Sequence, residues 1–521
     1  MFSWIKQHSN SIFCGLLIAI CAICVWGKFM VILSLILLSV FWCVQLPSKQ
    51  NFTLLTKRKT LLVIIVCCLV FIVRCLWQLP SADTGGEIQR WAVLAAFMLI
   101  FGSLQSLNHR QFFAIVCIYT ASLVVCSAFN FVYFILSEAN NVDVRHASIF
   151  MWYIRFVLFC LMGVAMCVYY LLFQKHIMLP RYAKILFLCS FVWLVFYLIF
   201  IKSITGYVGL LVLSVLSIYE RIRQYKKYDF LVIFLMAFTV LGVRVGYEAH
   251  FFLNPDGVDI EKLDTHTKQG NKYGKFFQRG FIENGHWVEL YTCKQEIIDN
   301  WHLYSDTPLL ETNAKGFKIY HNLMRYMTSK NLRKDAEGLA QLTAEDIRNI
   351  ENGYTNYRFT SQFKLSSRVY ESLEEGYMKS KGYNPQGNSI TQRFVFWQVS
   401  FNVFLENKLF GSGPKYYEEQ LHNHYAHMTL NERYWHQTHN QFLRILTTYG
   451  IVGFVGFVLT LLLIPIFSRK KMTMLSVAWY SIFVVSMTND DTLASLYGIM
   501  FVSLFCGLFL CVQPDIGNND K

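Results

Sequence analysis

The sequence predicts an all-α protein that crosses a membrane about twelve times and carries one large, mainly helical loop on the outer side. Of its 521 residues, 55% are apolar and only 15% are charged, against about 25% charged residues in an ordinary soluble chain. The apolar residues gather in runs of membrane-spanning length. One polar stretch, 247–390, interrupts them. This composition argues against a disordered chain, a disulfide scaffold or a plain cytosolic enzyme.

The net charge of +14 belongs to the apolar parts of the chain. Residues 247–390 carry 18 basic and 19 acidic residues and are almost neutral. A nucleic-acid-binding protein places its basic residues on a polar, exposed surface. Because this chain does the opposite, we expect no nucleic-acid partner.

Twelve runs have the length of a membrane-spanning helix, which needs roughly 20 apolar residues. They lie near 11–27, 29–46, 61–79, 88–107, 111–136, 149–173, 183–201, 204–219, 229–246, 448–468, 473–488 and 494–512. The chain is therefore expected to have four parts. These are transmembrane helices 1–9 in residues 1–246, a loop domain in 247–390, a segment 391–447 that returns to the membrane, and helices 10–12 with a tail in 448–521.

Basic residues in alternate short loops set the orientation, because lysine and arginine near helix ends are retained in the cytoplasm. One set of loops contains fifteen: Lys49, Lys57, Arg58, Lys59, Arg110, Lys175, Arg181, Lys184, Arg221, Arg223, Lys226, Lys227, Arg469, Lys470 and Lys471. The other short loops hold only Lys28, Arg90, Arg145 and Lys202. Both termini are predicted to be cytoplasmic, and the loop 247–390 to face outward.

The outward loop is expected to form a small helical domain that serves as a lid or a dock. Apolar residues recur every three to four positions near 323–330, 335–342, 344–351 and 367–375. After the loop, residues 391–410 have the pattern of an aromatic-rich amphipathic helix, with Arg393 in its first turn. Trp397 suits a helix at the membrane interface. A turn that contains Gly411 and Gly413 ends this segment.

Charged groups near membrane spans are costly and are functional candidates by default. A set of basic residues lies at the outward ends of the spans: Arg74, Arg90, Arg145, Arg155 and Arg244. Because arginine binds phosphate through paired hydrogen bonds, the set favours a cationic cavity for an anionic lipid head group. The alternative is that each arginine reaches the interface or pairs with an acid such as Glu87 or Asp143.

The strongest local signal is His439-Asn440, followed by Gly450 and Gly453 where the tenth span begins. The glycines allow close helix approach. A neutral imidazole at the outer membrane surface can accept a proton from a hydroxyl group. The alternative is an interfacial histidine without chemistry.

A cluster of histidines also raises the question of a metal site. Its members are His422, His424, His427, His436 and His439. The spacing could place two imidazoles on one metal ion. Apart from Glu432, no cysteine or acid lies at ligand spacing, so we expect no metal site.

These motifs resemble the signature region of the O-antigen ligase family. The resemblance rests on His-Asn, nine residues and Gly-x-x-Gly at 439–453, preceded by Arg393, Trp397 and the turn at 406–413. The family also includes some O-antigen polymerases and the bacterial protein O-oligosaccharyltransferases. The twelve-span layout, with a large outward loop before the tenth span, agrees with it.

The resemblance implies a GT-C-like fold and an inverting, metal-independent glycosyltransferase without a cofactor. Such an enzyme acts on undecaprenyl-pyrophosphate-linked glycan at the periplasmic face of a bacterial inner membrane. By position, His439 matches the histidine that activates or orients the acceptor hydroxyl. Arg393 matches the loop arginine that engages the lipid pyrophosphate, where fixed positive charge would stabilise the leaving group.

The chain departs from the family at the start of the eighth span, where Ile204 occupies the position of a second arginine. The candidates to replace it are Lys202, Arg74, Arg145, Arg155 and Arg244. Lysine would supply the charge without the paired hydrogen bonds of arginine.

The acceptor stays open at this point. Lipid A core is the leading expectation, with another lipid-linked repeat unit or a protein hydroxyl as alternatives. A flippase or transporter is a separate possibility, but transporters have related halves and this chain has no internal repeat.

Overall fold

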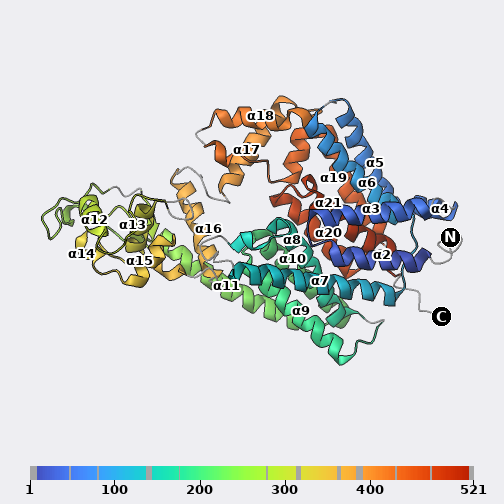
Figure 1. Cartoon of the computed structure of the whole chain (residues 1–521), viewed down its shortest axis with the longest axis horizontal. Helices are drawn as coiled ribbons and strands as arrows, with labels where there is room; N and C mark the ends of the chain where they lie inside the picture. The colour runs from blue at the N-terminus through green and yellow to red at the C-terminus, as the bar shows by residue number, and fades with distance from the viewer. Residues whose placement is uncertain are drawn as a thin grey trace. The chain divides into compact units, whose positions relative to one another are not determined.

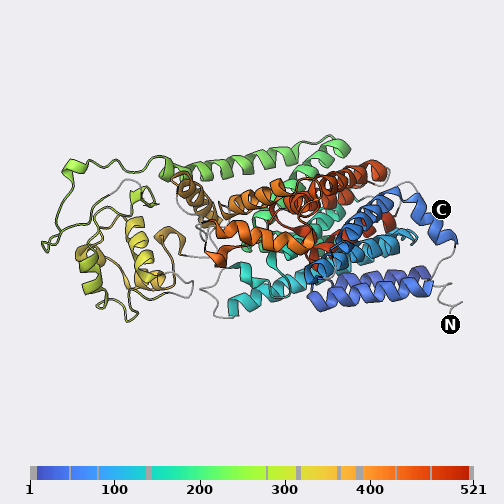
Figure 2. The same ribbon diagram turned by 90° about the horizontal axis from the view of Figure 1, so that it is seen from above.

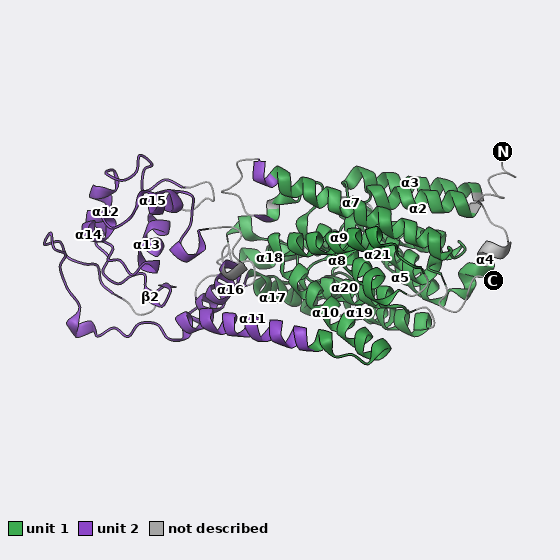
Figure 3. Cartoon of the chain, turned by 90° about the horizontal axis from the view of Figure 1, so that it is seen from below, with its two compact units in different colours: residues 1–133, 145–231, 392–521 green, residues 134–144, 232–391 purple. Residues whose placement is uncertain are grey.

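The computed structural model is mainly helical (Figure 1). It describes residues 9–45, 49–78, 81–136, 144–174, 177–276, 280–312, 318–360, 365–382, 391–428, 431–469 and 472–514. The chain forms two compact units, which Figure 3 colours separately. The first comprises residues 1–133, 145–231 and 392–521, and the second comprises residues 134–144 and 232–391.

The long apolar helices run mainly through the first unit. Its helices are α2 (Ser9–Ile23), α3 (Lys28–Gln45), α4 (Lys49–Lys57), α5 (Lys59–Leu76), α6 (Ala82–Gly102), α7 (His109–Leu136), α8 (Tyr153–Val168), α9 (Arg181–Phe200), α10 (Ile204–Tyr225), α17 (Thr391–Glu406), α18 (Pro414–Ala426), α19 (Gln441–Ser468), α20 (Met474–Asn489) and α21 (Leu496–Gly507). Helix α11 (Asp229–Leu253) begins in this unit and continues into the second. Each of the twelve apolar runs overlaps a helix.

Seven described helices are long and apolar enough to cross a membrane, and four shorter apolar helices accompany them. The seven are Lys59–Leu76, His109–Leu136, Tyr153–Phe173, Arg181–Phe200, Ile204–Tyr225, Asp229–Leu253 and Gln441–Ser468. The prediction of an all-α, multi-pass membrane protein is therefore confirmed.

Helix α8 lies at the centre of the first unit. Its residues from Ile154 to Cys167 are all buried, and apart from Arg155 near its start the helix is apolar on every side. It packs against α9, α10 and α20, while α5 packs against α6 and α19. Near the N-terminus, α2 and α3 form a hairpin of adjacent helices (Figure 2).

The second unit contains the folded part of the loop. Its short helices are α12 (Lys294–Trp301), α13 (Ile319–Ser329), α14 (Ala336–Leu339), α15 (Ala344–Glu351) and α16 (Leu365–Ser380), with a hairpin of β1 (Ile282–Glu283) and β2 (His286–Trp287). Ile297, Leu323, Leu339 and Ile350 share its core. The sequence predicted helices at the positions of α13 to α16, but it missed α12 and the hairpin. Both are too short to show a clear periodicity.

Candidate active site around His439

His439 is held in an unusual backbone conformation immediately before α19. Its φ of 48° lies in the left-handed region, which costs a non-glycine residue roughly 1–2 kcal/mol. Its backbone N–H donates to Asp491 Oδ2 at 3.2 Å, and the N–H of Asn440 donates to Asp491 Oδ1 at 2.9 Å. One carboxylate therefore fixes two successive peptide groups and offsets the strain.

The imidazole of His439 faces a second carboxylate. Its Nδ1 lies 3.4 Å from Oδ1 of Asp490, and its ring is about one-third exposed. The centroid of the Phe396 ring, in α17, lies 5.8 Å from the centroid of the His439 ring. A proton on Nδ1 would point at Asp490, which leaves Nε2 as the acceptor nitrogen.

Asn440 begins helix α19 by capping it. Its side-chain oxygen accepts from the N–H of Leu443 at 3.1 Å, while its amide group donates to the carbonyl of Thr488 at 3.0 Å. The cap satisfies a backbone donor that the first helical turn leaves open. The second bond ties the start of α19 to the end of α20.

Arg155 compensates the charge of Asp490. The two form a buried ion pair, while Arg155 Nε donates to Ser495 Oγ and Nη2 to the carbonyl of Asp491, each at 2.8 Å. Burial alone would raise the pKa of the Asp490 carboxyl, but Arg155 and His439 hold this pKa below its usual value. Asp490 is therefore a carboxylate when it faces His439. The pKa of Asp491 is raised, chiefly by burial.

A second ion network reaches this site from α6. Arg444 in α19 donates to Glu87 Oε1 at 2.7 Å, and its Nη1 lies 3.9 Å from Asp491 Oδ2. Arg90 donates to the same oxygen of Glu87 at 2.6 Å. Asp491 therefore lies between Arg444 and the backbone of His439.

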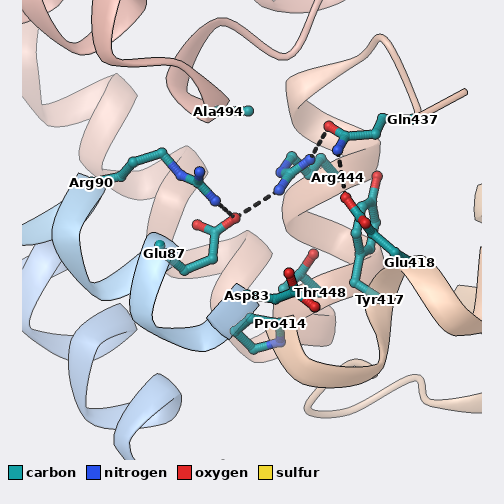
Figure 4. Close-up of a pocket in the computed structure, with 11 residues that line it drawn as sticks. Asp83, Glu87, Arg90, Pro414, Tyr417, Glu418, Gln437, Arg444, Thr448 and Ala494 are labelled. Carbon is teal, nitrogen blue, oxygen red and sulfur yellow. Dashed lines mark hydrogen bonds and ion pairs between the residues drawn. The ribbon is translucent and has the colours of Figure 1, made fainter. Parts of the chain in front are cut away.

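These ion pairs border a polar pocket of about 170 Å³, shown in Figure 4. Helix α6 supplies one side of it, and α18, α19 and the segment before α19 supply the other. Its lining residues are Asp83, Gly86, Glu87, Arg90, Pro414, Tyr417, Glu418, Gln437, Arg444, Thr448 and Ala494. The pocket and His439 thus share the segment 437–444 as a wall.

Gly450 interrupts the hydrogen bonding of α19. With φ 67° and ψ −169° it is not helical. Backbone groups next to the break form hydrogen bonds with the turn at 408–413 instead of within the helix. Ile451 and Val452 donate to the carbonyls of residues 408 and 409, at 2.8 and 3.2 Å. In return, the N–H groups of residues 412 and 413 donate to the carbonyls of residues 447 and 448, both at 2.9 Å.

The reciprocal hydrogen bonds between the 408–413 turn and α19 form a clasp. The close approach of the two backbones in this clasp explains why the turn contains glycines. Gly411 and Gly413 have positive φ, and a Cβ on Gly411 would overlap the backbone at Thr448. Gly453, one turn after the break, lies close to Tyr449 and Phe71. The glycines predicted for close helix approach thus join α19 to the 408–413 turn and α5.

Replacing Gly450 by alanine is expected to destabilise the protein by at least about 1–3 kcal/mol, the cost of a strained left-handed residue. The added Cβ would also overlap the backbone of Leu409 and Phe410. Gly456→Ala is the matched control, because a Cβ there meets nothing within 4 Å and the helix is regular. Thermal unfolding of the purified variants measures the difference, and equal melting temperatures would contradict this role of Gly450.

Arg393 and Trp397 lie on α17, the helix that contacts His439. Arg393 is half-buried in the first turn, three residues before Phe396. Trp397 packs against the cluster that joins α17 to α18. The predicted helix at 391–410 is present but ends at Glu406, because residues 408–413 form the clasp with α19.

The other predicted basic residues lie in different places. Arg74 Nη2 reaches the carbonyl of Phe410 at 3.4 Å, beside the clasp. Arg145 lies in the 3-10 helix Val144–Ala147. Lys202 precedes α10, where Thr205 Oγ1 donates to Asn489 Oδ1 at 3.1 Å. The start of α10, where the family arginine was expected, therefore adjoins the Asp490 turn.

The alternative that these arginines pair with acids is confirmed at three positions. Arg90 pairs with Glu87, as considered from the sequence, and Arg155 pairs with Asp490. In the second unit, Arg244 pairs at 2.7 Å with Glu248, which also accepts from Arg358 at 2.8 Å. Asp143, the other acid considered, lies outside the described residues.

The histidine cluster does not converge on one point. His424 Nε2 lies 3.0 Å from Glu406 Oε1, and the ring of His422 packs against Trp435. His436 and His439 have ring centroids 6.1 Å apart. Within the described part of the chain, no three histidine, cysteine or acidic side chains form a group that could hold a metal ion.

Sequence reasoning missed Asp490 and Asp491. They are adjacent acids in a short connection between two apolar runs, and charge so close to the membrane is itself a functional signal. That signal was sought only among basic residues. Arg444 was within the predicted signature, but no role was inferred for it.

Residues 353–458 match the sequence model of a family described as O-antigen ligase. The resemblance to the O-antigen ligase family is confirmed. The match spans α17, α18 and most of α19, and includes Arg393 and His439. It also includes Gly411, Gly413 and Gly450 of the clasp. No match was found among curated proteins or among solved structures. The match supports a glycosyltransferase-type protein of the O-antigen ligase and polymerase group, and the apolar helices fit a multi-pass protein of the inner membrane.

Proposed function

We propose that this protein moves a polysaccharide from undecaprenyl pyrophosphate to the hydroxyl group of lipid A core at the periplasmic face of the inner membrane. The observation that carries the proposal is the contact of His439 with the ionised, Arg155-paired carboxylate of Asp490, within the region that matches the family. In this proposal both termini are cytoplasmic, and the fold is GT-C-like.

His439 acts as the general base in the proposed reaction. Asp490 holds the proton of the neutral imidazole on Nδ1, so that Nε2 is free to take the proton of the acceptor hydroxyl. The hydroxyl oxygen attacks the anomeric carbon, the bond from that carbon to the pyrophosphate oxygen breaks, and the configuration inverts. The imidazolium that forms is stabilised by the carboxylate of Asp490.

The leaving pyrophosphate needs positive charge, and we assign this role to Arg393 with Lys202, Arg74 and Arg145 as further candidates. Guanidinium groups that bind the leaving group more tightly as its charge develops lower the barrier. Arg155 is the buried ion-pair partner of Asp490, and we assign it a supporting role that acts through this carboxylate. Arg244 pairs with Glu248 in the second unit.

Arg393→Ala is expected to lower kcat/KM for the lipid-linked donor by about tenfold to a hundredfold, the loss of one or two charge-assisted hydrogen bonds. Arg393→Lys should recover part of this loss, because lysine keeps the charge but not the paired geometry. The assay uses purified protein with lipid-linked glycan and rough lipopolysaccharide, and follows the glycosylated product.

Lys330→Ala is a suitable control, because it removes a basic residue that pairs with Asp346 in the second unit. An Arg393→Ala enzyme as active as this control would contradict the assignment of Arg393. Transfer to a second lipid-linked repeat unit or to a protein, instead of lipid A core, would identify the protein as a polymerase or a protein transferase.

A further inference from the structure

The pocket between α6, α18 and α19 has the size of a single sugar ring. Its volume of about 170 Å³ corresponds to about six water molecules, at roughly 30 Å³ each. A six-membered ring with its hydroxyl groups displaces a comparable amount of water. A longer glycan would have to leave the pocket after one ring.

One residue that lines this pocket carries a buried hydroxyl group without a partner in the described part of the chain. Thr448 is 1% exposed, and its Oγ1 makes no hydrogen bond to the described residues. Nε of Arg90 is likewise buried and unpaired. Buried polar atoms without partners are rare in proteins, and each of these two lies in a residue that lines the pocket. A sugar hydroxyl group that reached either atom would supply the missing partner.

Acceptors are also available along the wall. Arg90 and Arg444 both donate to Oε1 of Glu87, which leaves its Oε2 as an acceptor. Asp83 is exposed to solvent at the pocket, and Glu418 Oε1 accepts from Gln437 at 2.7 Å. Carboxylates of this kind accept hydrogen bonds from sugar hydroxyls.

The charges of the lining argue against an anionic occupant. Three carboxylates, of Asp83, Glu87 and Glu418, stand against the two guanidinium groups of Arg90 and Arg444. Both guanidinium groups are already bound to Glu87. A pyrophosphate or an acidic sugar would meet uncompensated negative charge, whereas a neutral sugar would not.

We propose that this pocket binds one uncharged sugar ring of the glycan donor or of the acceptor and rejects acidic sugars. The inference rests on the proposed glycosyltransferase function. The segment 437–444 forms one wall of the pocket and also carries His439, so the bound ring belongs to the substrate whose hydroxyl or anomeric carbon reacts there.

Thr448→Val tests the proposal, because valine has the shape of threonine without the hydroxyl. The variant should fold as well as the wild type, since the lost hydroxyl has no hydrogen-bond partner among the residues that the structure describes. Thr120→Val is the matched control. Thr120 is 3% exposed and its Oγ1 also finds no partner among the described residues, but it does not line the pocket.

Saturation-transfer NMR on the purified protein measures binding directly, with methyl α-glucoside, methyl α-galactoside and methyl α-glucuronide as probes. We expect a neutral glycoside to bind the wild type and Thr120→Val, and to bind Thr448→Val about twofold to tenfold more weakly, the loss of one neutral hydrogen bond. The glucuronide should bind only when Asp83→Asn and Glu418→Gln are combined. Equal binding to the two valine variants, or no binding of either neutral glycoside, would overturn the proposal.

Steady-state kinetics of glycan transfer show whether the bound sugar ring is part of the donor or of the acceptor. A rise in KM of Thr448→Val for the lipid-linked donor assigns the pocket to the donor, and a rise in KM for the acceptor assigns it to the acceptor. If the wild-type protein binds the sugar but transfers no glycan, the proposed function is contradicted and the proposed sugar binding is supported. If the wild-type protein transfers glycan and the Thr448→Val and Thr120→Val variants have the same kinetic constants, the proposed sugar binding is overturned. The proposed function is then unaffected.

Discussion

Replacing His439 by glutamine is expected to lower kcat for glycan transfer about 100-fold to 10,000-fold, the usual contribution of a general base. Glutamine can keep a hydrogen bond to Asp490 but cannot accept a proton. The site should therefore stay folded while the acceptor hydroxyl loses its base. Initial rates of product formation at saturating donor and acceptor measure the effect.

His424→Gln is the control for this prediction. His424 belongs to the same histidine-rich segment but pairs with Glu406, away from Asp490. We expect its kcat to stay within about twofold of the wild-type value, as for other substitutions outside a catalytic site. If His439→Gln behaved in the same way, His439 would not be the base.

Replacing Asp490 by asparagine is expected to cost about 3–5 kcal/mol of stability, because Arg155 is left as an uncompensated buried charge. Asp229→Asn is the control. It breaks the ion pair of Arg221 and Asp229, whose acid is 43% exposed, and surface pairs contribute only about 0–1 kcal/mol. Unfolding by denaturant, followed for both variants, gives the comparison.

The double variant Arg155→Met with Asp490→Leu separates stability from catalysis. Replacing both members of a buried pair with apolar residues should restore most of the stability, yet the enzyme should stay inactive because no carboxylate then faces Nδ1 of His439. Recovery of activity in the double variant would contradict the role given to Asp490.

The pH dependence of this pair has a defined sign. The pKa of Asp490 in the folded protein lies below its usual value, so the pair contributes fully above the unfolded pKa of about 3.9. Its contribution is lost only as the pH falls through the lower, folded pKa. The Asp490→Asn variant should therefore show a smaller loss of stability in acid than the wild type.

The membrane architecture was predictable because long apolar helices leave a strong signal along the chain. Each apolar run overlaps a helix, although only seven described helices meet the length and hydropathy expected of a span. Helix α6 was found despite Glu87 and Arg90 in its first turns. Glu87 and Arg90 pair with each other one helical turn apart, and only the fold supplies Arg444 as a second partner of Glu87.

The active site was predictable only in part. His439 and the glycines follow one another in the sequence, so a local pattern reveals them. Asp490 and Asp491 reach His439 from about fifty residues away, because α19 and α20 fold back on each other. Such contacts depend on tertiary packing, and so does the pairing of Arg155 with Asp490. The clasp that Gly411 and Gly450 form was likewise hidden, although the glycines themselves were identified.

Electrophoresis of lipopolysaccharide from a deletion strain tests the central claim most directly. We expect deletion to remove all long polysaccharide chains while free lipid-linked polymer accumulates. Wild-type protein should restore the chains, and His439→Gln protein at equal abundance should not. Long chains that persist in the deletion strain, or that return with the His439→Gln protein, would contradict transfer of glycan to lipid A core through His439.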